Sequence, residues 1–233
     1  MNDRTAEKIT IAACWDGRDY YPPVYVNTLY AMCRRHTAHP FDFVLFAGPD
    51  AEARRPEIHP DIKMIQTGLP YWWSGMNAFR ADAPGVETET VLYLDLDNVI
   101  LGSLDDIIAL PYDLACMKDE PSFSCPVRRA RNVNVSVTLI RNGAGAPVWD
   151  VYVAAGKPVW NPLTARANAP LRMAAQEIID RLGIAQLIPE EWVCSYKYQV
   201  LRRGLPADCR VVSFHGRPKP HECSEKWIAE NWR

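Results

Sequence analysis

The sequence predicts an α/β domain built on a mostly parallel sheet with helices on both of its faces. Short apolar runs rich in β-forming residues alternate with helical patterns along the chain, which is typical of such sheets. No repeat or interdomain linker interrupts this alternation. A chain of 233 residues fits one large domain and is long enough to bury a core. We therefore expect a single domain.

Strands are expected where apolar runs end in turn-forming residues. The clearest run, 91–94, leads directly into two aspartates, and the first run, 8–14, has the composition of a buried strand. The other predicted strands are 41–46, 63–66, 114–117, 135–140 and 211–214.

Helices are expected where apolar residues recur at a spacing of three and four. The stripe over 23–33 begins at a proline, which suits the first turn of a helix. A second stripe over 171–182 stops at Gly183, which suits a left-handed C-cap. A short helix over 222–232 is expected at the end. Two stretches, 122–132 and 157–170, are expected to leave the sheet and cover a site.

The composition excludes several classes of protein. Lys plus Arg number 26 against 28 Asp plus Glu, so no basic excess points to nucleic acid. No apolar run reaches the ~18 residues of a membrane span, and the polar start is not a signal peptide, so a cytoplasmic protein is expected. Seven cysteines without a Cys-x-x-Cys pair indicate reduced thiols rather than a zinc site or a disulfide framework.

Two carboxylates follow the clearest predicted strand. Asp95 and Asp97 stand at positions i and i+2, which project to the same side of an extended chain. Like charges held close repel unless a cation or a proton lies between them. Because ligands of open α/β sheets bind outside the carboxyl ends of the strands, the pair suits Mn²⁺ or Mg²⁺ bound to a nucleotide diphosphate. The same pattern also occurs in helix-capping turns.

A late loop carries a second set of chemical groups. Residues 215–220 read His-Gly-Arg-Pro-Lys-Pro, and the glycine and prolines fix a turn. The imidazole is able to complete the coordination of a metal, and the cations are able to hold phosphate oxygens. The alternative interpretation is a basic surface turn.

These motifs resemble those of the glycogenin and lipopolysaccharide-galactosyltransferase type of retaining glycosyltransferase, which has a GT-A fold. The specific likeness lies in Tyr-Leu-Asp-Leu-Asp at 93–97, followed by Leu-Gly-Ser-Leu, and in the loop at 215–220. Weaker likeness extends over 9–33, where the family binds the nucleoside, over 73–79, and over 134–140, which lines the sugar pocket. The resemblance covers nearly the whole chain in order.

The resemblance implies a metal-dependent hexosyltransferase that moves a sugar from a nucleotide-sugar, usually a UDP-sugar, to an acceptor hydroxyl with retention. Asp95 and Asp97 would bind Mn²⁺ (or Mg²⁺), with His215 as the third protein ligand. Lys219 and the amide of Gly216 would stabilise the leaving diphosphate. The acceptor, whether a sugar, a lipid-linked group or a protein, is not specified.

The resemblance also assigns catalytic and donor-binding positions. The expected catalytic residues are Asp97, Gln176 and Lys219. Besides Asp95, Gly216 and Lys219, the residues expected to contact the donor are Ala13, Asp16, Tyr21, Leu96 and Asn134. Residues 1–104 would form the half that binds the nucleotide-sugar. Residues 105–233 would form the acceptor-side half, with the metal and phosphate loop at its end.

The sequence departs from the family pattern at three places. Ser213 stands where the family has its metal-binding His, three residues before the Gly. Gly75 stands where many members carry a Lys that contacts the donor, and Arg80 is a candidate substitute. Ala175 replaces the Asp of the family's Gly-Asp-Gln segment, and Gln176 or Glu177 could face the sugar instead. These changes predict an altered acceptor or an impaired enzyme.

Aromatic residues suggest further contacts. The run at 71–73 is interpreted either as core packing or as a platform for an acceptor sugar. Trp192, Tyr196 and Lys197 could line the acceptor cleft. Trp227 and Trp232 in the terminal helix could make a peripheral membrane contact, but the acidic residues of that helix favour docking on the domain.

Two rival functions remain open from the sequence. A phosphohydrolase of the haloacid-dehalogenase type also carries Asp-x-Asp after a strand, with Asp95 as nucleophile and Asp97 as acid/base. That motif normally opens its domain, whereas here about 90 residues precede it. The second rival is a nucleotide-sugar-binding domain that keeps the carboxylate pair but has lost turnover, which Gly75 and Ala175 would favour.

Overall fold

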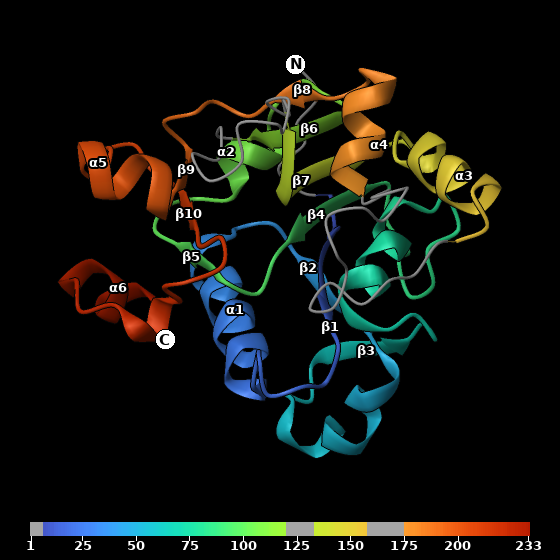
Figure 1. Ribbon diagram of the computed structural model, residues 1–233, viewed down its shortest axis with the longest axis horizontal. Helices are drawn as coiled ribbons and strands as arrows, with labels where there is room; N and C mark the ends of the chain where they lie inside the picture. The colour runs from blue at the N-terminus through green and yellow to red at the C-terminus, as the bar shows by residue number, and fades with distance from the viewer. Residues whose placement is uncertain (1–6, 120–132, 158–174) are drawn as a thin grey trace, which may run out of the picture.

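The computed structural model describes residues 7–119, 133–157 and 175–233, and Figure 1 shows their arrangement. The strands are β1 (Ile9–Trp15), β2 (Phe41–Ala47), β3 (Ile62–Gln66), β4 (Thr90–Leu94), β5 (Asn98–Ile100), β6 (Leu114–Lys118), β7 (Val133–Arg141), β8 (Gln186–Leu187), β9 (Val193–Ser195) and β10 (Val211–Ser213). The α-helices are α1 (Pro23–His36), α2 (Asp105–Ile108), α3 (Ala146–Ala154), α4 (Ala175–Leu182), α5 (Leu201–Arg203) and α6 (Lys226–Asn231). Tighter or wider helical turns are η2 (Pro49–Glu57), η3 (Tyr71–Phe79), η4 (Tyr196–Val200) and η5 (Pro220–Glu222).

A seven-stranded sheet in the order β3-β2-β1-β4-β7-β6-β8 forms the centre. The strands β3, β2, β1 and β4 run parallel to one another. β7 runs antiparallel between β4 and β6, and β8 pairs in parallel with β6. The sheet is therefore mostly parallel, as predicted, and the carboxyl ends of β1 and β4 meet at one edge.

A second sheet of three short strands lies beside the first. β10 pairs antiparallel with β5, which places Ser213 opposite Asn98. β10 also pairs in parallel with β9, which places Ser213 beside Ser195. Because β5 begins directly after Asp97, this small sheet brings the ends of β9 and β10 to the carboxylate pair.

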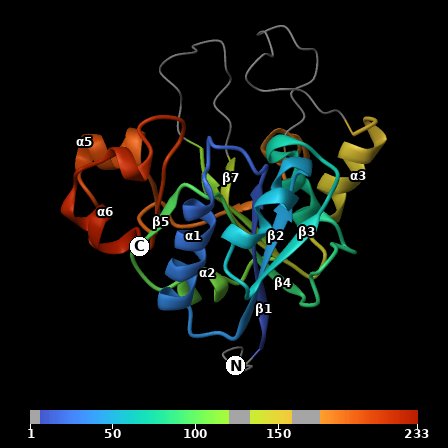
Figure 2. The same ribbon diagram turned by 90° about the horizontal axis from the view of Figure 1, so that it is seen from below.

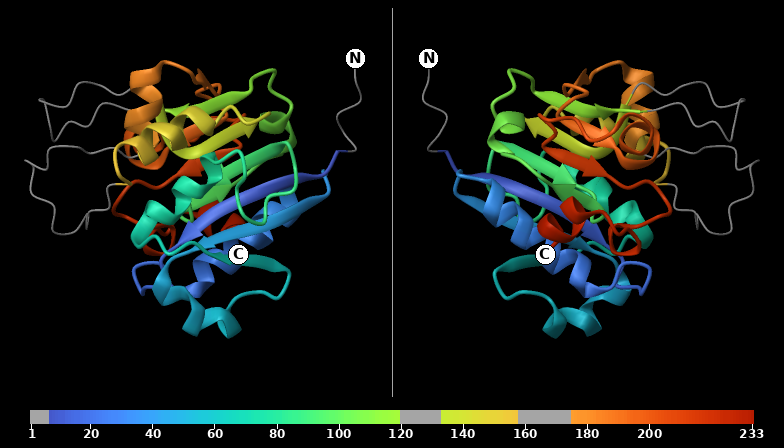
Figure 3. Two further views of the ribbon diagram at one scale, coloured as in Figure 1. Left: turned by 90° about the vertical axis from the view of Figure 1, so that its right-hand side faces the viewer. Right: turned by 90° about the vertical axis from the view of Figure 1, so that its left-hand side faces the viewer.

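Helices cover both faces of the large sheet, as predicted. One face packs against α1 through fully buried side chains such as Tyr25 and Leu29. The other face packs against η3, α3 and α4 through Trp73, Tyr152 and Ile178. Figure 2 shows α1 and α6 on the side away from α3, and Figure 3 shows α3 and α4 side by side. Two apolar cores thus hold the sheet edge in place.

The predicted strands are confirmed to within two residues at each end, and the terminal helix is confirmed as α6 but begins at Lys226 rather than at 222. The chain forms η5 and α6, separated by an extended segment. The Glu222 carboxylate accepts a hydrogen bond from the Lys219 backbone N–H at 2.7 Å, which closes η5 as a separate turn. α6 docks on the domain as expected, with Ile228 buried and the Trp232 ring 5.1 Å from that of Tyr25.

Three sequence expectations lie wholly or partly outside the described residues. These are the covering stretch at 122–132, all but the first residue of the stretch at 157–170, and the beginning of the helical stripe at 171–174. Gly183 ends α4 with a φ of +63°, as its predicted capping role requires. Within the described ranges, the cysteines are free thiols, and no helix has the length and apolar character to cross a membrane.

Candidate active site

The backbone after β4 fixes where the two carboxylates stand. The Asp95 N–H donates to the Ser136 carbonyl at 2.9 Å, and the Asn98 amide donates to the same carbonyl at 2.8 Å. Both bonds tie the turn to β7, the antiparallel neighbour of β4. The sequence between β4 and β5 is therefore held rigidly at the carboxyl edge of the sheet, where ligands of open α/β sheets bind.

Asp95 is held by hydroxyl groups from the strands. The Ser136 hydroxyl donates to one carboxylate oxygen at 2.7 Å, and the Tyr93 hydroxyl lies 3.3 Å from the other. Burial raises the pKa of Asp95 to about 6, and the nearby charge of Asp97 adds to the increase. The two hydroxyls and the Lys219 ammonium oppose it. The two carboxylates therefore share one electrostatic environment, as the sequence predicts.

Asp97 is held by groups from loops. Its carboxylate accepts a hydrogen bond from the Tyr21 hydroxyl at 2.8 Å and lies 2.5 Å from the Lys219 ammonium. The ammonium also donates to the Tyr21 hydroxyl at 2.5 Å. The side chains of Lys219 and Asp97 are only 5% and 7% exposed, so this is a buried ion pair. The structure thus brings together the expected catalytic residues Asp97 and Lys219.

The loop at 215–220 reaches the same place from the end of β10. Burial lowers the pKa of His215; the charge of Asp97 raises it, and the ammonium groups of Lys197 and Lys219 lower it further. Gly216 has a φ of +67°, a conformation that glycine adopts at little cost. The imidazole of His215 and the ammonium of Lys219 thus reach the site from the loop, and the ammonium of Lys197 reaches it from η4.

The two carboxylates fit a divalent cation by charge and by ligand type, because such ions prefer oxygen ligands. The third protein ligand is less clear from the geometry. Within the described residues, no three His, Cys, Asp or Glu side chains form a group that could hold a metal ion. The structure therefore does not gather Asp95, Asp97 and His215 into a ready-made site, and the ligand role of His215 stays a prediction.

Ser213 stands where the sequence resemblance leads us to expect a metal-binding histidine. It is fully buried, and its hydroxyl oxygen has no hydrogen-bond partner in the described structure. The side-chain oxygen of Asn98, opposite it in the small sheet, is likewise buried and unpartnered. Two buried polar atoms without a partner therefore lie at paired positions of β5 and β10, next to the segment that carries the carboxylates.

The donor-binding residues predicted from the first strand and the turn after β4 fall into two kinds. Ala13 and Leu96 are buried in the core, so they can offer only backbone groups to a donor. Asp16 is half-buried at the end of β1, and its carboxylate accepts the Arg18 backbone N–H at 3.0 Å. Tyr21 lies in the carboxylate cluster itself, where its hydroxyl contacts Asp97.

Asn134 and Gln176 have different relations to the site. The Asn134 side-chain oxygen accepts the Ser136 N–H at 2.8 Å, so Asn134 shapes the segment that presents Ser136 to Asp95. Gln176 is half-buried in the first turn of α4. In the part of the chain that the structure describes, no hydrogen bond joins Gln176 to Asp95, Asp97 or Lys219. Its catalytic role stays a prediction.

Gly75 is explained by its surroundings. A Cβ on Gly75 would lie 2.7 Å from the Tyr93 hydroxyl and 3.2 Å from the Cys14 sulfur, so a side chain would fit there only if Tyr93 moved. Arg80, the suggested substitute for the family lysine, is instead bound to Asp82 at 2.9 Å and lies over the Trp149 ring. The cation that the family supplies from this segment is therefore missing here.

Sequence reasoning missed two polar residues of the site. Ser136 has the most direct contact with Asp95, and the polar position within an apolar strand was the only signal for it. Lys197 was assigned to an acceptor cleft, but its ammonium donates to the His215 carbonyl at 2.9 Å. Its nearness to the loop depends on the pairing of β9 with β10, which the sequence does not reveal.

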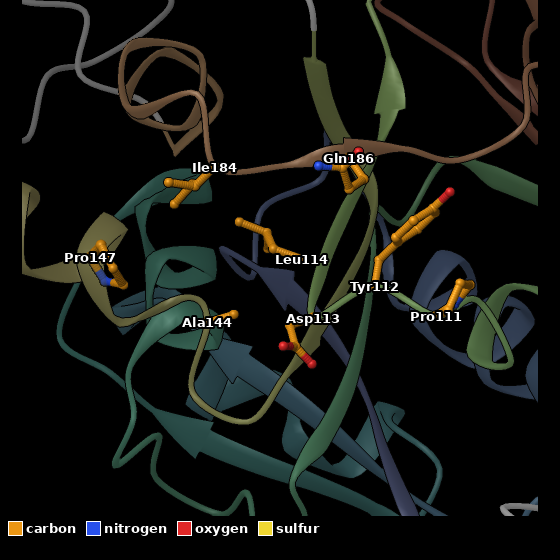
Figure 4. A pocket seen from close by; sticks show the side chains of 8 residues that line it. All are labelled: Pro111, Tyr112, Asp113, Leu114, Ala144, Pro147, Ile184 and Gln186. Carbon is orange, nitrogen blue, oxygen red and sulfur yellow. The ribbon is translucent and has the colours of Figure 1, made fainter.

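Two hollows lie at the other end of the sheet. One of about 440 Å³ is shown in Figure 4, and one of about 350 Å³ includes Thr90 and Arg141. Thr90 begins β4 and Arg141 ends the antiparallel β7, so this end is opposite to Asp95. The residues that line the first hollow are Pro111, Tyr112, Asp113, Leu114, Ala144, Pro147, Ile184 and Gln186. Neither hollow contains a predicted site residue.

Solved structures of glycosyltransferases share this fold. The galactosyltransferase LgtC, solved in complex with donor and acceptor sugar analogs, is 15% identical with a TM-score of 0.59, over 91% of this chain and 89% of LgtC. GlyE from Streptococcus pneumoniae TIGR4 is 15% identical with a TM-score of 0.61, over 97% of this chain and 61% of GlyE. The bifunctional glycosyltransferase WbbM is 13% identical with a TM-score of 0.62, over 100% of this chain and 50% of WbbM.

The likeness to these structures confirms the predicted single-domain GT-A fold. No protein-family model matches the sequence, and no curated protein matches it. At identities of 13–15%, the likeness establishes the fold, and the function has to be argued from the residues at the sheet edge.

Proposed function

We propose that the protein is a glycosyltransferase that moves a sugar from a nucleotide-sugar, of which a UDP-sugar is the first candidate, to an acceptor hydroxyl. The observation that supports this most is the buried cluster of Asp95, Asp97, Tyr21 and Lys219 at the carboxyl edge of a GT-A sheet. An edge of this kind is where α/β folds hold phosphorylated ligands. The cluster offers both the anionic and the cationic groups that a diphosphate site needs.

The chain's own residues perform binding and charge stabilisation in this proposal. Ser136 and Tyr93 orient the Asp95 carboxylate, and Tyr21 orients that of Asp97. The ammonium of Lys219 and the backbone N–H of Gly216 stabilise the negative charge that develops on the departing diphosphate. The apolar cores behind the edge keep these groups fixed, so little reorganisation is needed during the reaction.

A divalent cation, Mn²⁺ or Mg²⁺, is part of the proposal. Asp95 and Asp97 would hold it, and when bound it would act as a Lewis acid on the diphosphate. Retention of anomeric configuration is proposed from the family resemblance alone. A cytoplasmic location is likewise proposed from the sequence.

The two rivals differ in what supports them. The phosphohydrolase interpretation needs a haloacid-dehalogenase fold, whereas this chain has the GT-A arrangement, and 94 of its 233 residues precede Asp95. A binding domain without turnover keeps the same fold and the same carboxylates. The experiment therefore has to distinguish such a binding domain from an active glycosyltransferase.

The test is a thermal-shift screen of nucleotide-sugars with and without MnCl₂, followed by assays of nucleoside diphosphate release. A ligand that binds only the folded chain raises its unfolding temperature by mass action. We expect a metal-dependent shift with one class of nucleotide-sugar and slow diphosphate release, both lost in Asp95→Asn. The exposed Asp82→Asn variant makes the same chemical change away from the site and should behave as wild type.

The outcomes separate the possibilities. Stabilisation by a donor without release or transfer, over long incubation with varied acceptors, would favour the binding domain. Hydrolysis of p-nitrophenyl phosphate that depends on Asp95 would favour the phosphohydrolase. No stabilisation by any nucleotide-sugar, with or without metal, would refute the proposed function.

A further inference from the structure

Lys197 lies beside the loop at 215–220 because β9 pairs with β10. Ser195 and Ser213 are parallel partners at the ends of these strands. Two residues further along, the Lys197 ammonium donates to the His215 carbonyl at 2.9 Å. It also lies 3.7 Å from the place that a Cβ on Gly216 would take. Because Gly216 has no side chain, the Lys197 ammonium lies next to the exposed backbone of this turn.

The two lysines at this loop are in different electrostatic states. Lys219 is buried and already forms an ion pair with Asp97. Lys197 is only half-buried, and its hydrogen-bond partner is a neutral carbonyl. In the described ranges it makes no ion pair with a carboxylate. Of the two, Lys197 is thus the cation whose charge is available to an arriving anion.

The segment that supplies a lysine in the resembling family cannot do so here. The Tyr93 hydroxyl fills the space beside Gly75, and Arg80 is bound to Asp82. With a divalent cation held by Asp95 and Asp97, the cation, the two carboxylates and the Lys219 ammonium together carry one net positive charge, which does not balance the diphosphate of a nucleotide-sugar. A second ammonium would balance it, and among the described groups Lys197 is placed to supply one.

We propose that Lys197 binds the diphosphate of the nucleotide donor, acting with the Gly216 turn in place of the lysine missing at position 75. This inference rests on the proposed function and adds a residue to it. Lys197 sits in η4, a stretch of π-helical turn, and such turns are frequent at functional sites. The ammonium would donate charge-assisted hydrogen bonds to phosphate oxygens, either in place of its contact with the His215 carbonyl or in addition to it.

The test compares a nucleoside diphosphate with its nucleoside. Binding of UDP and of uridine to the full chain is measured by calorimetry with MnCl₂ held constant, and GDP, ADP and CDP with their nucleosides are run in parallel. In Lys197→Met we expect the diphosphate to bind about 10- to 100-fold more weakly, while the nucleoside binds unchanged. Lys197→Arg should keep most of the affinity.

A matched control removes a lysine elsewhere. Lys63 on the outer strand β3 pairs with Asp42, so Lys63→Met makes the same charge change away from the site and should leave diphosphate binding unchanged. Thermal unfolding of each variant checks that it is folded. The arginine variant keeps the test valid if methionine disturbs the loop.

Two results would overturn the inference while leaving the proposed function standing. One is undiminished diphosphate affinity in Lys197→Met. The other is an equal loss for diphosphate and nucleoside, which would mean that Lys197 only shapes the loop through the His215 carbonyl. If the wild-type chain binds no nucleoside diphosphate at all, the proposed function fails and this inference fails with it.

Discussion

The two carboxylates of the Asp-Leu-Asp motif are equivalent in the sequence but lie in contrasting regions of the structure. Asp95 belongs to the strand side of the site, where Ser136 on β7 and Tyr93 on β4 hold it with neutral hydroxyls. Asp97 belongs to the loop side, where Tyr21 and Lys219 reach it from segments far apart in the chain. One carboxylate is positioned by the sheet, and the other is neutralised by a loop.

This difference separates two requirements of a diphosphate site. On the strand side, the ionised Asp95 lowers the stability of the fold, because burial and the neighbouring Asp97 raise its pKa. The loop side compensates a negative charge with a buried ammonium, so each partner depends on the other. We therefore expect substitutions on the loop side to damage the fold and those on the strand side mainly to alter binding.

The largest expected effect comes from breaking the ion pair of the loop side. Asp97→Asn leaves the Lys219 ammonium buried without its carboxylate, and removing one partner of such a pair costs about 3–5 kcal/mol. We expect urea denaturation to show a loss of this size, together with loss of metal-dependent diphosphate binding. Removing both charges, in Asp97→Asn with Lys219→Met, should restore most of the stability but none of the binding. Equal instability of the single and double variants would contradict a stabilising role for the pair.

A smaller effect is expected when only the bridging hydroxyl is removed. Tyr21→Phe deletes the hydrogen bonds to Asp97 and Lys219 but keeps the ring and the ion pair, so we expect a loss of about 2 kcal/mol. Tyr20→Phe is a matched control, because Tyr20 is 53% exposed and its ring alone lies near the Lys219 ammonium. If both variants are equally stable in urea denaturation, Tyr21 does not hold the pair.

The main strands and the strand side of the site were predictable because their signals are local. The apolar run that ends in Asp95 predicts both the strand and the end of the strand at which polar groups follow. The small sheet was not predictable, since β5, β9 and β10 have three residues each and exist only through non-local pairing. Lys197 reaches the loop at 215–220 through that pairing, so its position could not be inferred from the sequence.

The loop side shows a second limit of sequence reasoning. The basic and aromatic residues were recognised, but which groups meet depends on how distant segments fold together. Tyr21 was assigned to the nucleoside, and Lys219 to phosphate, whereas in the structure both side chains contact Asp97 and each other. The start of the terminal helix was misplaced for a related reason, because a backbone contact at Lys219 closes a separate turn before α6.

On the strand side, removal of the hydroxyl that orients Asp95 should have a moderate effect. Ser136→Ala removes a hydrogen bond to a charged group, which is worth about 1.5 kcal/mol, and lets the carboxylate rotate. We expect diphosphate binding in the presence of Mn²⁺ to weaken about tenfold by calorimetry. Thr138→Val removes another buried hydroxyl of β7, one that donates to the Val135 carbonyl, and should lower stability without changing binding. Equal binding losses in the two variants would indicate a general disturbance of β7.

The smallest effect is a gain in stability on the strand side, and it depends on pH. In the metal-free protein the pKa of Asp95 is about 6, above its ordinary value of 3.8, so between these values the folded chain binds a proton that the unfolded chain has released. Stability then falls as pH rises through this window, and the ionised carboxylate is destabilising at pH 7. Asp95→Asn should thus be more stable than wild type at pH 7, on the order of 1 kcal/mol, since weaker hydrogen bonds from Ser136 and Tyr93 offset part of the gain.

The advantage of Asp95→Asn should disappear near pH 4, where both chains are neutral at this position. Chemical denaturation at pH 4, 5.5 and 7 measures it. Asp82→Asn is the control, because Arg80 shifts the pKa of Asp82 in the opposite direction, below its ordinary value. That variant should therefore gain no stability at pH 7. A stability difference for Asp95→Asn that is constant across the pH range would mean that the charge of Asp95 is not the cause. The strand side would then not be the region where the protein gives up stability to keep a carboxylate ready for its ligand.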